Sequence, residues 1–214
     1  MGNIKQAVDF VLKQEDATLA GHVTTIRGDH GGRTRFGLTE RFHPQLAESG
    51  YFDEAKVGRE DALRIAEETY EQEYAVKLHL SEIADPALMV AMLSFAINDG
   101  PEEGARLLQL ALVHCGAQIG CDGVIGEQTV AAANATNPDA LLDAYVSVQT
   151  DFYHHICLHN PSQIEFLAGW LNRAKSVAVA AKKLRSTSAP AAPAAAAPAP
   201  EGEESPVMPE SDAA

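Results

Sequence analysis

Apolar residues recur at helical spacing through most of the chain. The pattern predicts helices over residues 4–15, 58–78, 87–97, 102–115, 140–158 and 163–184. The segment 87–97 is apolar at almost every position, which indicates a helix buried at the centre of a bundle. Asn137 and Pro138 are expected to cap the helix that follows them. The pattern therefore predicts a mainly helical domain.

Two short segments depart from this pattern. The β-branched run at residues 22–26 predicts at most a short β-hairpin near Leu19–Arg27, or an irregular loop. Leu38–Phe42 is expected to open a second helix, which stops near Pro44. The predicted fold class is thus mainly α with a minor β or loop element after the first helix.

Composition divides the chain near residue 186. From Ser186 onward Pro, Ala, Ser and Glu replace the large apolar residues, which indicates a disordered tail over residues 186–214. The 214 residues are enough for one domain of ordinary size plus a tail, and the hydrophobic content of 46% supports a hydrophobic core. The net charge of −14 argues against nucleic-acid binding, which requires cations that neutralise phosphates.

The sequence shows no targeting or membrane signal. The start of the chain is amphipathic rather than a basic segment followed by an apolar run, so we expect synthesis in the cytoplasm without a signal peptide. No stretch is long and apolar enough for membrane insertion. The three cysteines lack zinc-ligand spacing and are expected to be free thiols. His155 and His159 share a helix face, but ordinary histidines at a helix end are favoured over a metal site. We expect a monomer without metal or cofactor.

Glu15 is the candidate for acid catalysis. It follows Val11 and Leu12 on the apolar face of the first helix. Desolvation disfavours the charged form of a carboxyl group, and a protonated carboxyl group beside a polar loop can act as a general acid. On position alone, a solvated surface glutamate is the commoner outcome.

A glycine-rich loop follows, with the sequence Asp-His-Gly-Gly-Arg-Thr-Arg-Phe-Gly from Asp29 to Gly37. Gly31 and Gly32 permit positive φ and the close approach of a ligand to the backbone. Asp29 and Thr34 add a second acid and a hydroxyl, and glycoside hydrolysis uses such pairs of carboxyl groups. A glycine turn with an Asx cap is the structural alternative.

The stretch from Glu15 to Gly37 resembles the N-terminal signature of the glycoside hydrolase family 108 N-acetylmuramidases, which are lysozyme-like peptidoglycan hydrolases. That family has a helix ending in Glu-Gly-Gly-Tyr and a loop Asp-x-Gly-Gly-x-Thr-x-x-Gly. The resemblance implies that Glu15 is the general acid, that Asp29 stabilises charge or orients water, and that Thr34 positions water or holds Asp29. The chain departs from the signature because Asp-Ala-Thr follows Glu15 and the spacing to Asp29 is longer.

The resemblance extends along the rest of the chain. It implies substrate contacts for Tyr70, Tyr74 and Asn98. The segment Asp-Gly-Val-Ile-Gly at 122–126 resembles the peptidoglycan-binding segment of the family, although turn chemistry alone explains it. The family also ends in a similar Gly-Trp-x-x-Arg helix, in which we expect Trp170 to be a core anchor. The implied organisation is a catalytic region, a helical peptidoglycan-binding region and a tail, over residues 1–97, 98–185 and 186–214.

The implied function is hydrolysis of the β-1,4 bond between N-acetylmuramic acid and N-acetylglucosamine in peptidoglycan glycan strands. A lytic transglycosylase with a single catalytic Glu is a close variant. A non-catalytic cell-wall-binding or scaffold protein of the same fold is the alternative from another class. Without a signal peptide, the protein would reach the periplasmic cell wall after release or delivery, as an endolysin, a prophage remnant or a secreted effector would.

Overall fold

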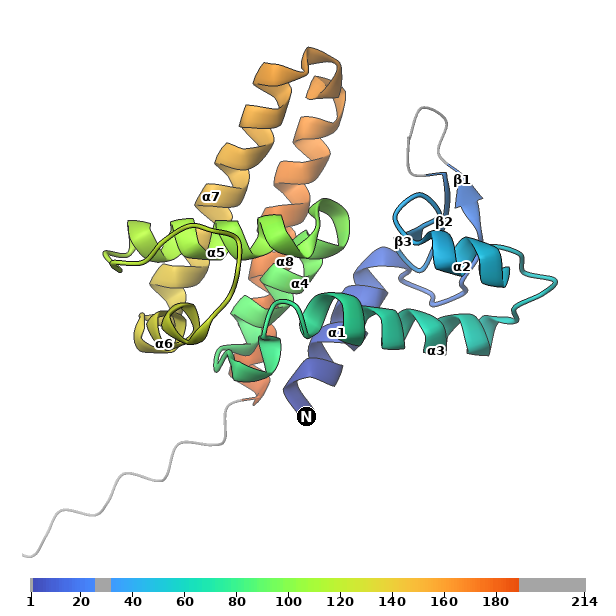
Figure 1. The fold of residues 1–214 in the computed structure, drawn as a ribbon, viewed down its shortest axis with the longest axis horizontal. Coiled ribbons are helices and arrows are strands. Elements are labelled where there is room, and N and C mark those ends of the chain that lie inside the picture. The colour runs from blue at the N-terminus through green and yellow to red at the C-terminus, as the bar shows by residue number, and fades with distance from the viewer. Residues whose placement is uncertain (1, 26–31, 189–214) are drawn as a thin grey trace, which may run out of the picture.

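The computed structural model describes residues 2–25 and 32–188. Helices predominate in these residues, and a small sheet follows the first helix (Figure 1). The first part contains α1 (Gly2–Glu15), β1 (Thr24–Thr25), β2 (Arg33–Arg35), β3 (Leu38–Thr39), α2 (Pro44–Ser49), α3 (Arg59–Thr69), the π-helical turn η1 (Tyr70–Ala75) and the 3-10 turn η2 (Leu80–Glu82). The second part contains α4 (Pro86–Asp99), α5 (Pro101–His114), α6 (Glu127–Ala135), α7 (Pro138–His159), the 3-10 turn η3 (Pro161–Gln163) and α8 (Ile164–Ser188). The predicted mainly helical fold is confirmed.

Helix α4 lies at the centre of the helical core. All of its residues from Ala87 to Ile97 are buried, and α1, α5, α7 and α8 pack around it. Its start is fixed by Asp85, whose carboxylate accepts hydrogen bonds from the backbone N–H groups of Ala87 at 3.1 Å and Leu88 at 3.3 Å. The apolar pattern of this segment therefore predicted both its helix and its central position.

The chain between α1 and α2 forms a three-stranded antiparallel sheet in the order β1-β2-β3. Thr34 of β2 pairs with Thr24 on one side and with Thr39 on the other. The predicted hairpin near Leu19–Arg27 was therefore too small, because the sheet continues to Thr39. The predicted helix over Leu38–Phe42 was wrong, because its first two residues form β3 and α2 begins at Pro44.

The turn between β2 and β3 explains this difference. Phe36 and Gly37 have φ angles of 50° and 78°, and two central residues with positive φ make the tight turn that joins twisted strands. Only the second of these residues is a glycine, so the sequence shows only one of the two residue preferences that usually indicate such a turn. The hydroxyl of Tyr70 donates a hydrogen bond of 2.7 Å to the carbonyl oxygen of Phe36, which holds the unusual backbone in place.

The predicted helix over residues 58–78 is present as two parts with different winding. Helix α3 continues directly into η1, where the backbone N–H of Val76 bonds to the carbonyl oxygen of Glu71 at 3.0 Å. Tyr70 and Tyr74 are both buried in this wider turn. An apolar pattern of helical period does not distinguish such a turn from an α-helix, and π-helical turns are frequent at functional sites.

Helices α7 and α8 form a long hairpin that projects beyond the other helices (Figure 1). The predicted cap of α7 is confirmed, because the Asn137 side chain accepts hydrogen bonds from the backbone N–H groups of Asp139 and Ala140. Helix α8 runs to Ser188, two residues past the predicted start of the tail at Ser186, and residues 189–214 lie outside the described residues. No helix within residues 2–25 and 32–188 combines the length and the hydropathy required to span a bilayer.

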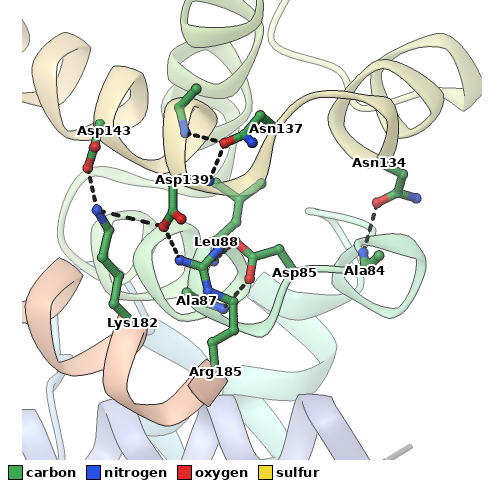
Figure 2. Close-up of polar contacts among 11 residues, drawn as sticks. Ala84, Asp85, Ala87, Leu88, Asn134, Asn137, Asp139, Asp143, Lys182 and Arg185 are labelled. Carbon is green, nitrogen blue, oxygen red and sulfur yellow. Dashed lines mark hydrogen bonds and ion pairs between the residues drawn. The ribbon is translucent and has the colours of Figure 1, made fainter. Parts of the chain in front are cut away.

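A group of ion pairs joins the end of α8 to its neighbours (Figure 2). The Arg185 guanidinium contacts the carboxylate of Asp85, 3.4 Å away, and that of Asp139. Lys182, one turn earlier, pairs with Asp143 at 2.7 Å. Asp85 also caps α4, so this ion-pair group connects the C-terminal end of α8 to both α4 and α7.

Candidate active site

Glu15 ends helix α1 and is largely withdrawn from solvent, with 13% of its side chain exposed. The buried residues Val11 and Leu12 precede it and anchor the last turn of the helix in the core. The position agrees with the carboxyl group at the end of an apolar stripe that the sequence predicted. Two other elements, the β2–β3 turn and helix α8, contact the Glu15 side chain.

The β2–β3 turn contacts Glu15 through a glycine. A Cβ atom built on Gly37 would lie 2.8 Å from Cγ of Glu15 and 2.4 Å from the hydroxyl oxygen of Tyr70. Both distances are too short for a real side chain, so the turn reaches Glu15 this closely only because residue 37 has no side chain. Gly37 therefore allows the backbone of the β2–β3 turn to lie directly against the Glu15 side chain.

Helix α8 contacts Glu15 through the positive charge of Arg173. The Arg173 guanidinium donates a hydrogen bond to the Glu15 carboxylate, and the two residues form an ion pair across 158 positions of sequence. Its other terminal nitrogen donates to the side-chain oxygen of Asn98 at 3.3 Å. Asn98 in turn donates to the carbonyl oxygen of Ser94 at 2.9 Å, which fixes the orientation of its amide. Arg173 thus connects the ends of α1 and α4.

A second carboxyl group, that of Asp99, lies beside Asn98 at the end of α4. The Tyr153 hydroxyl of α7 donates a hydrogen bond of 3.3 Å to it. Burial raises the pKa of Asp99 to about 6, although the Tyr153 hydrogen bond and the charge of Arg173 act in the opposite direction. Perturbed carboxyl groups of this kind are common at functional sites.

A cavity of about 460 Å³ opens beside these groups. Tyr74, Asn98 and Asp99 line it, together with His43 and Glu73. The hydroxyl of Tyr74 is 3.0 Å from Nε2 of His43, and burial raises the pKa of Tyr74 to about 12, with the charge of Glu73 as a smaller cause. The cavity joins residues of η1, of the segment after β3, and of the α4–α5 junction. It can hold a polar ligand next to Asn98 and Asp99.

The predicted site residues divide into those near Glu15 and those elsewhere. Asn98 reaches Glu15 through Arg173, and Tyr74 shares the cavity with Asn98. Tyr70 is fully buried, and its hydroxyl bonds to Phe36, so it supports the β2–β3 turn instead of facing a ligand. Burial raises the pKa of the Tyr70 hydroxyl far above its usual range, and the charge of Glu15 acts in the same direction.

The loop residues are described only in part. Asp29 and Gly31 lie outside the described residues. Thr34 is half-buried in the central strand of the sheet. Gly32 has a φ of 80° and lies against Glu40. Among the residues that the structure describes, no group of three or more His, Cys, Asp or Glu side chains is placed to hold a metal ion.

Sequence reasoning missed Arg173 and Asp99. The Gly-Trp-x-x-Arg segment contained Arg173, but helical spacing alone could not indicate which distant carboxylate it meets. Asp99 precedes Gly100 and Pro101, and this pattern indicates a helix end without distinguishing a buried acid.

A family model described as "Glycosyl hydrolase 108" matches residues 8–100. This region belongs to that glycoside hydrolase family. A second model, described as "Predicted Peptidoglycan domain", matches residues 103–175. Glu15 and Asn98 lie in the first match and Arg173 lies in the second. The chain is therefore a glycoside hydrolase with peptidoglycan as its substrate.

A solved structure supports the fold of this chain. The structure of Brucella abortus SagA is similar to it with a TM-score of 0.62 and 24% sequence identity. The similarity covers 85% of this chain and 95% of the SagA chain, so the two share a fold over nearly their whole described length. The comparison with curated proteins finds no match.

Proposed function

We propose that the protein is an N-acetylmuramidase that hydrolyses the β-1,4 bond between N-acetylmuramic acid and N-acetylglucosamine, with Glu15 as the general acid. The observation that carries this proposal is the placement of Glu15. Its carboxyl group is mostly withdrawn from water and is held between the Gly37 turn and Arg173 of the peptidoglycan domain. Low exposure and fixed orientation are what proton transfer to a bound sugar requires.

In the proposed reaction, protonated Glu15 gives its proton to the glycosidic oxygen while the bond from that oxygen to C1 breaks. The bonding electron pair leaves with the oxygen, and positive charge develops on the sugar ring. Water then adds to C1, and a carboxylate of the site takes up the proton that the water releases. The products are two shorter glycans, one with a new reducing end.

Arg173 acts in this scheme as a positioning residue. In the free protein it bonds to one oxygen of the Glu15 carboxylate. Glu15 must carry a proton when it acts as the acid, so the pair has to loosen as the glycan binds. The ion pair therefore holds Glu15 in place before substrate arrives, and Asn98 holds Arg173.

The second carboxyl group of the reaction has two candidates. Asp29 is proposed to stabilise the developing charge or to orient water, with Thr34 holding it or the water, as the family resemblance implies. Asp99 is the competing candidate, because it lines the cavity and is close enough to Arg173 to feel its charge. The glycan is proposed to contact Tyr74 and Asn98 in the cavity.

The test is product analysis on purified, dye-labelled peptidoglycan. Release of soluble dye together with new reducing N-acetylmuramic acid ends would support the proposal. New 1,6-anhydro ends would identify a lytic transglycosylase, and reducing N-acetylglucosamine ends would place the cut at the other bond. No release, with retained binding to the insoluble wall, would favour a non-catalytic cell-wall-binding protein.

A further inference from the structure

One face of α8 carries two aromatic residues next to Arg173. Phe166, Trp170 and Arg173 follow one another at intervals of four and three residues, so they lie on the same side of the helix. Arg173 contacts Glu15. Phe166 is seven residues away from Arg173, which corresponds to about 10 Å along the helix axis. An aromatic surface therefore begins beside the proposed acid and runs toward the tip of the α7–α8 hairpin.

Packing against α7 holds the rings of Trp170 and Phe166 in place. Trp170 stacks on Tyr153 of α7 with ring centroids 5.2 Å apart and an angle of 29° between the planes. Phe166 stacks on Trp170 with centroids 6.0 Å apart at the same angle. Tyr153 is itself fixed by its hydrogen bonds with Asp99 and Gln149. Trp170 is an anchor on the core, as predicted, but the row of rings continues outward to Phe166.

Phe166 is the exposed end of this row. It keeps 42% of its surface accessible, whereas Trp170 packs against the hydrophobic core. A pre-oriented aromatic ring beside polar groups is a common component of ligand sites. The apolar faces of pyranose rings pack on aromatic rings, and the N-acetyl methyl group adds apolar area.

From this arrangement we infer that Phe166 and Trp170 form a binding subsite for an N-acetylhexosamine ring of the glycan strand whose bond is cleaved at Glu15. The inference rests on the proposed function for the location of the scissile bond. Arg173 lies between Glu15 and the two rings on the same face of α8. A glycan strand that lies over Glu15 and extends along α8 would therefore contact these rings next, which favours a sugar ring as the occupant. The peptidoglycan domain then contributes directly to the substrate site.

The chain offers a built-in reporter for this subsite. Trp170 is its only tryptophan, so the intrinsic emission of the full-length protein reports on this face of α8. The experiment uses Glu15→Gln as the parent, which prevents cleavage, and titrates it with soluble glycan strands released from peptidoglycan by an amidase. We expect a saturable change in Trp170 emission.

Variants of Phe166 then test the ring itself. Phe166→Ala in the same parent should weaken the apparent affinity roughly three- to tenfold, the range of a single aromatic contact. Phe166→Tyr keeps the ring and should retain the affinity. Ile164→Ala is the matched control, because Ile164 is 67% exposed and lies about half a helical turn away from the Arg173 face. Thermal unfolding of each variant checks that the fold is kept.

Several outcomes would overturn the inference. These are the absence of a saturable emission change, equal affinity of Phe166→Ala and its parent, or a response to phosphatidylglycerol vesicles but not to glycan strands. Cleavage by the protein with Glu15 intact is measured separately. Phe166-dependent binding without cleavage would leave the subsite standing and refute the muramidase proposal, whereas unchanged kcat/KM in Phe166→Ala would refute only the subsite.

Discussion

Two regions of the molecule meet at Glu15 and hold it by different physical means. The turn at Phe36–Gly37 presses its backbone against the side chain, and this contact depends on the absence of a Cβ atom. Helix α8 reaches the same side chain with the charge of Arg173. The turn is close to Glu15 in sequence and contacts it sterically, whereas α8 is distant in sequence and contacts it electrostatically. The comparison shows that a short motif can contain the steric half of a site while the fold supplies the charge.

Removing the group that both regions hold should have the largest effect. Glu15→Gln keeps the shape of the side chain but removes the proton donor, so kcat on peptidoglycan should fall by roughly a hundred- to ten-thousand-fold. Dye release measures this, and Glu48→Gln on the exposed surface of α2 is the control. Near-normal turnover of Glu15→Gln together with loss of activity in Asp29→Asn would show that the acid was wrongly assigned.

The steric region is broken by Gly37→Ala. A Cβ at a φ of 78° is strained and would collide with Tyr70 and Glu15, so the free energy of unfolding should fall by roughly 2–4 kcal/mol, with loss of activity. Gly169→Ala on α8 is the control, because no atom other than those of its two chain neighbours and the nearby helix backbone lies within 4 Å of its Cβ position. That variant should be neutral or more stable by about 0.5–1 kcal/mol. Equal chemical denaturation curves for the two variants would contradict this account of the turn.

The environment beside Arg173 is tested through pH. Burial raises the pKa of Asp99 to about 6, above its value of about 3.9 in the unfolded chain. The folded state therefore binds the extra proton, and stability is lost as the pH rises through the folded value. Asp99→Asn should raise the free energy of unfolding by about 1–3 kcal/mol at about pH 8 and hardly change it near pH 4. Asp151→Asn on exposed α7 surface is the control, and a pH-independent gain would refute the prediction.

The electrostatic region is broken most gently by Arg173→Lys. Lysine keeps the charge but loses the planar fork that contacts Glu15 and Asn98 together. We expect kcat/KM to fall roughly tenfold through misplacement of Glu15. Stability should change by less than about 1 kcal/mol, since the pair is partly exposed to solvent. Lys175→Ala, exposed on the same helix, should change neither. A large loss of stability with normal kcat/KM would make Arg173 purely structural.

Much of the helical architecture could be predicted from the sequence because its signals are local and repeated. The apolar run of α4 and the cap at Asn137 both specify structure within a few residues. Strand β3 could not be predicted, because two residues, Leu38 and Thr39, carry no periodicity and their pairing partner lies across a turn. The π-helical turn at Tyr70 was hidden for a related reason, since its apolar spacing also suits an α-helix.

The candidate site was predictable in the same uneven way. Glu15 stood out because its position on the apolar face and the family signature agree. Arg173 did not stand out, because an ion pair across 158 residues is specified by the packing of α8 and not by any local pattern. The assignment of residues 1–97 as the catalytic region and 98–185 as the binding region stays a prediction. The contact between Arg173 and Glu15 joins these two regions.

The ion-pair group at the end of α8 has a consequence for the rotation of that helix. Arg185 and Arg173 are twelve residues apart, so their side chains leave the helix axis in directions that differ by about 120°. One is tied to Asp85 and Asp139, and the other to Glu15. Ion pairs on two different sides of α8 oppose both its rotation and its displacement by one residue. These ion pairs thereby favour one rotation of α8 about its axis. That rotation determines the direction in which Phe166 and Trp170 face.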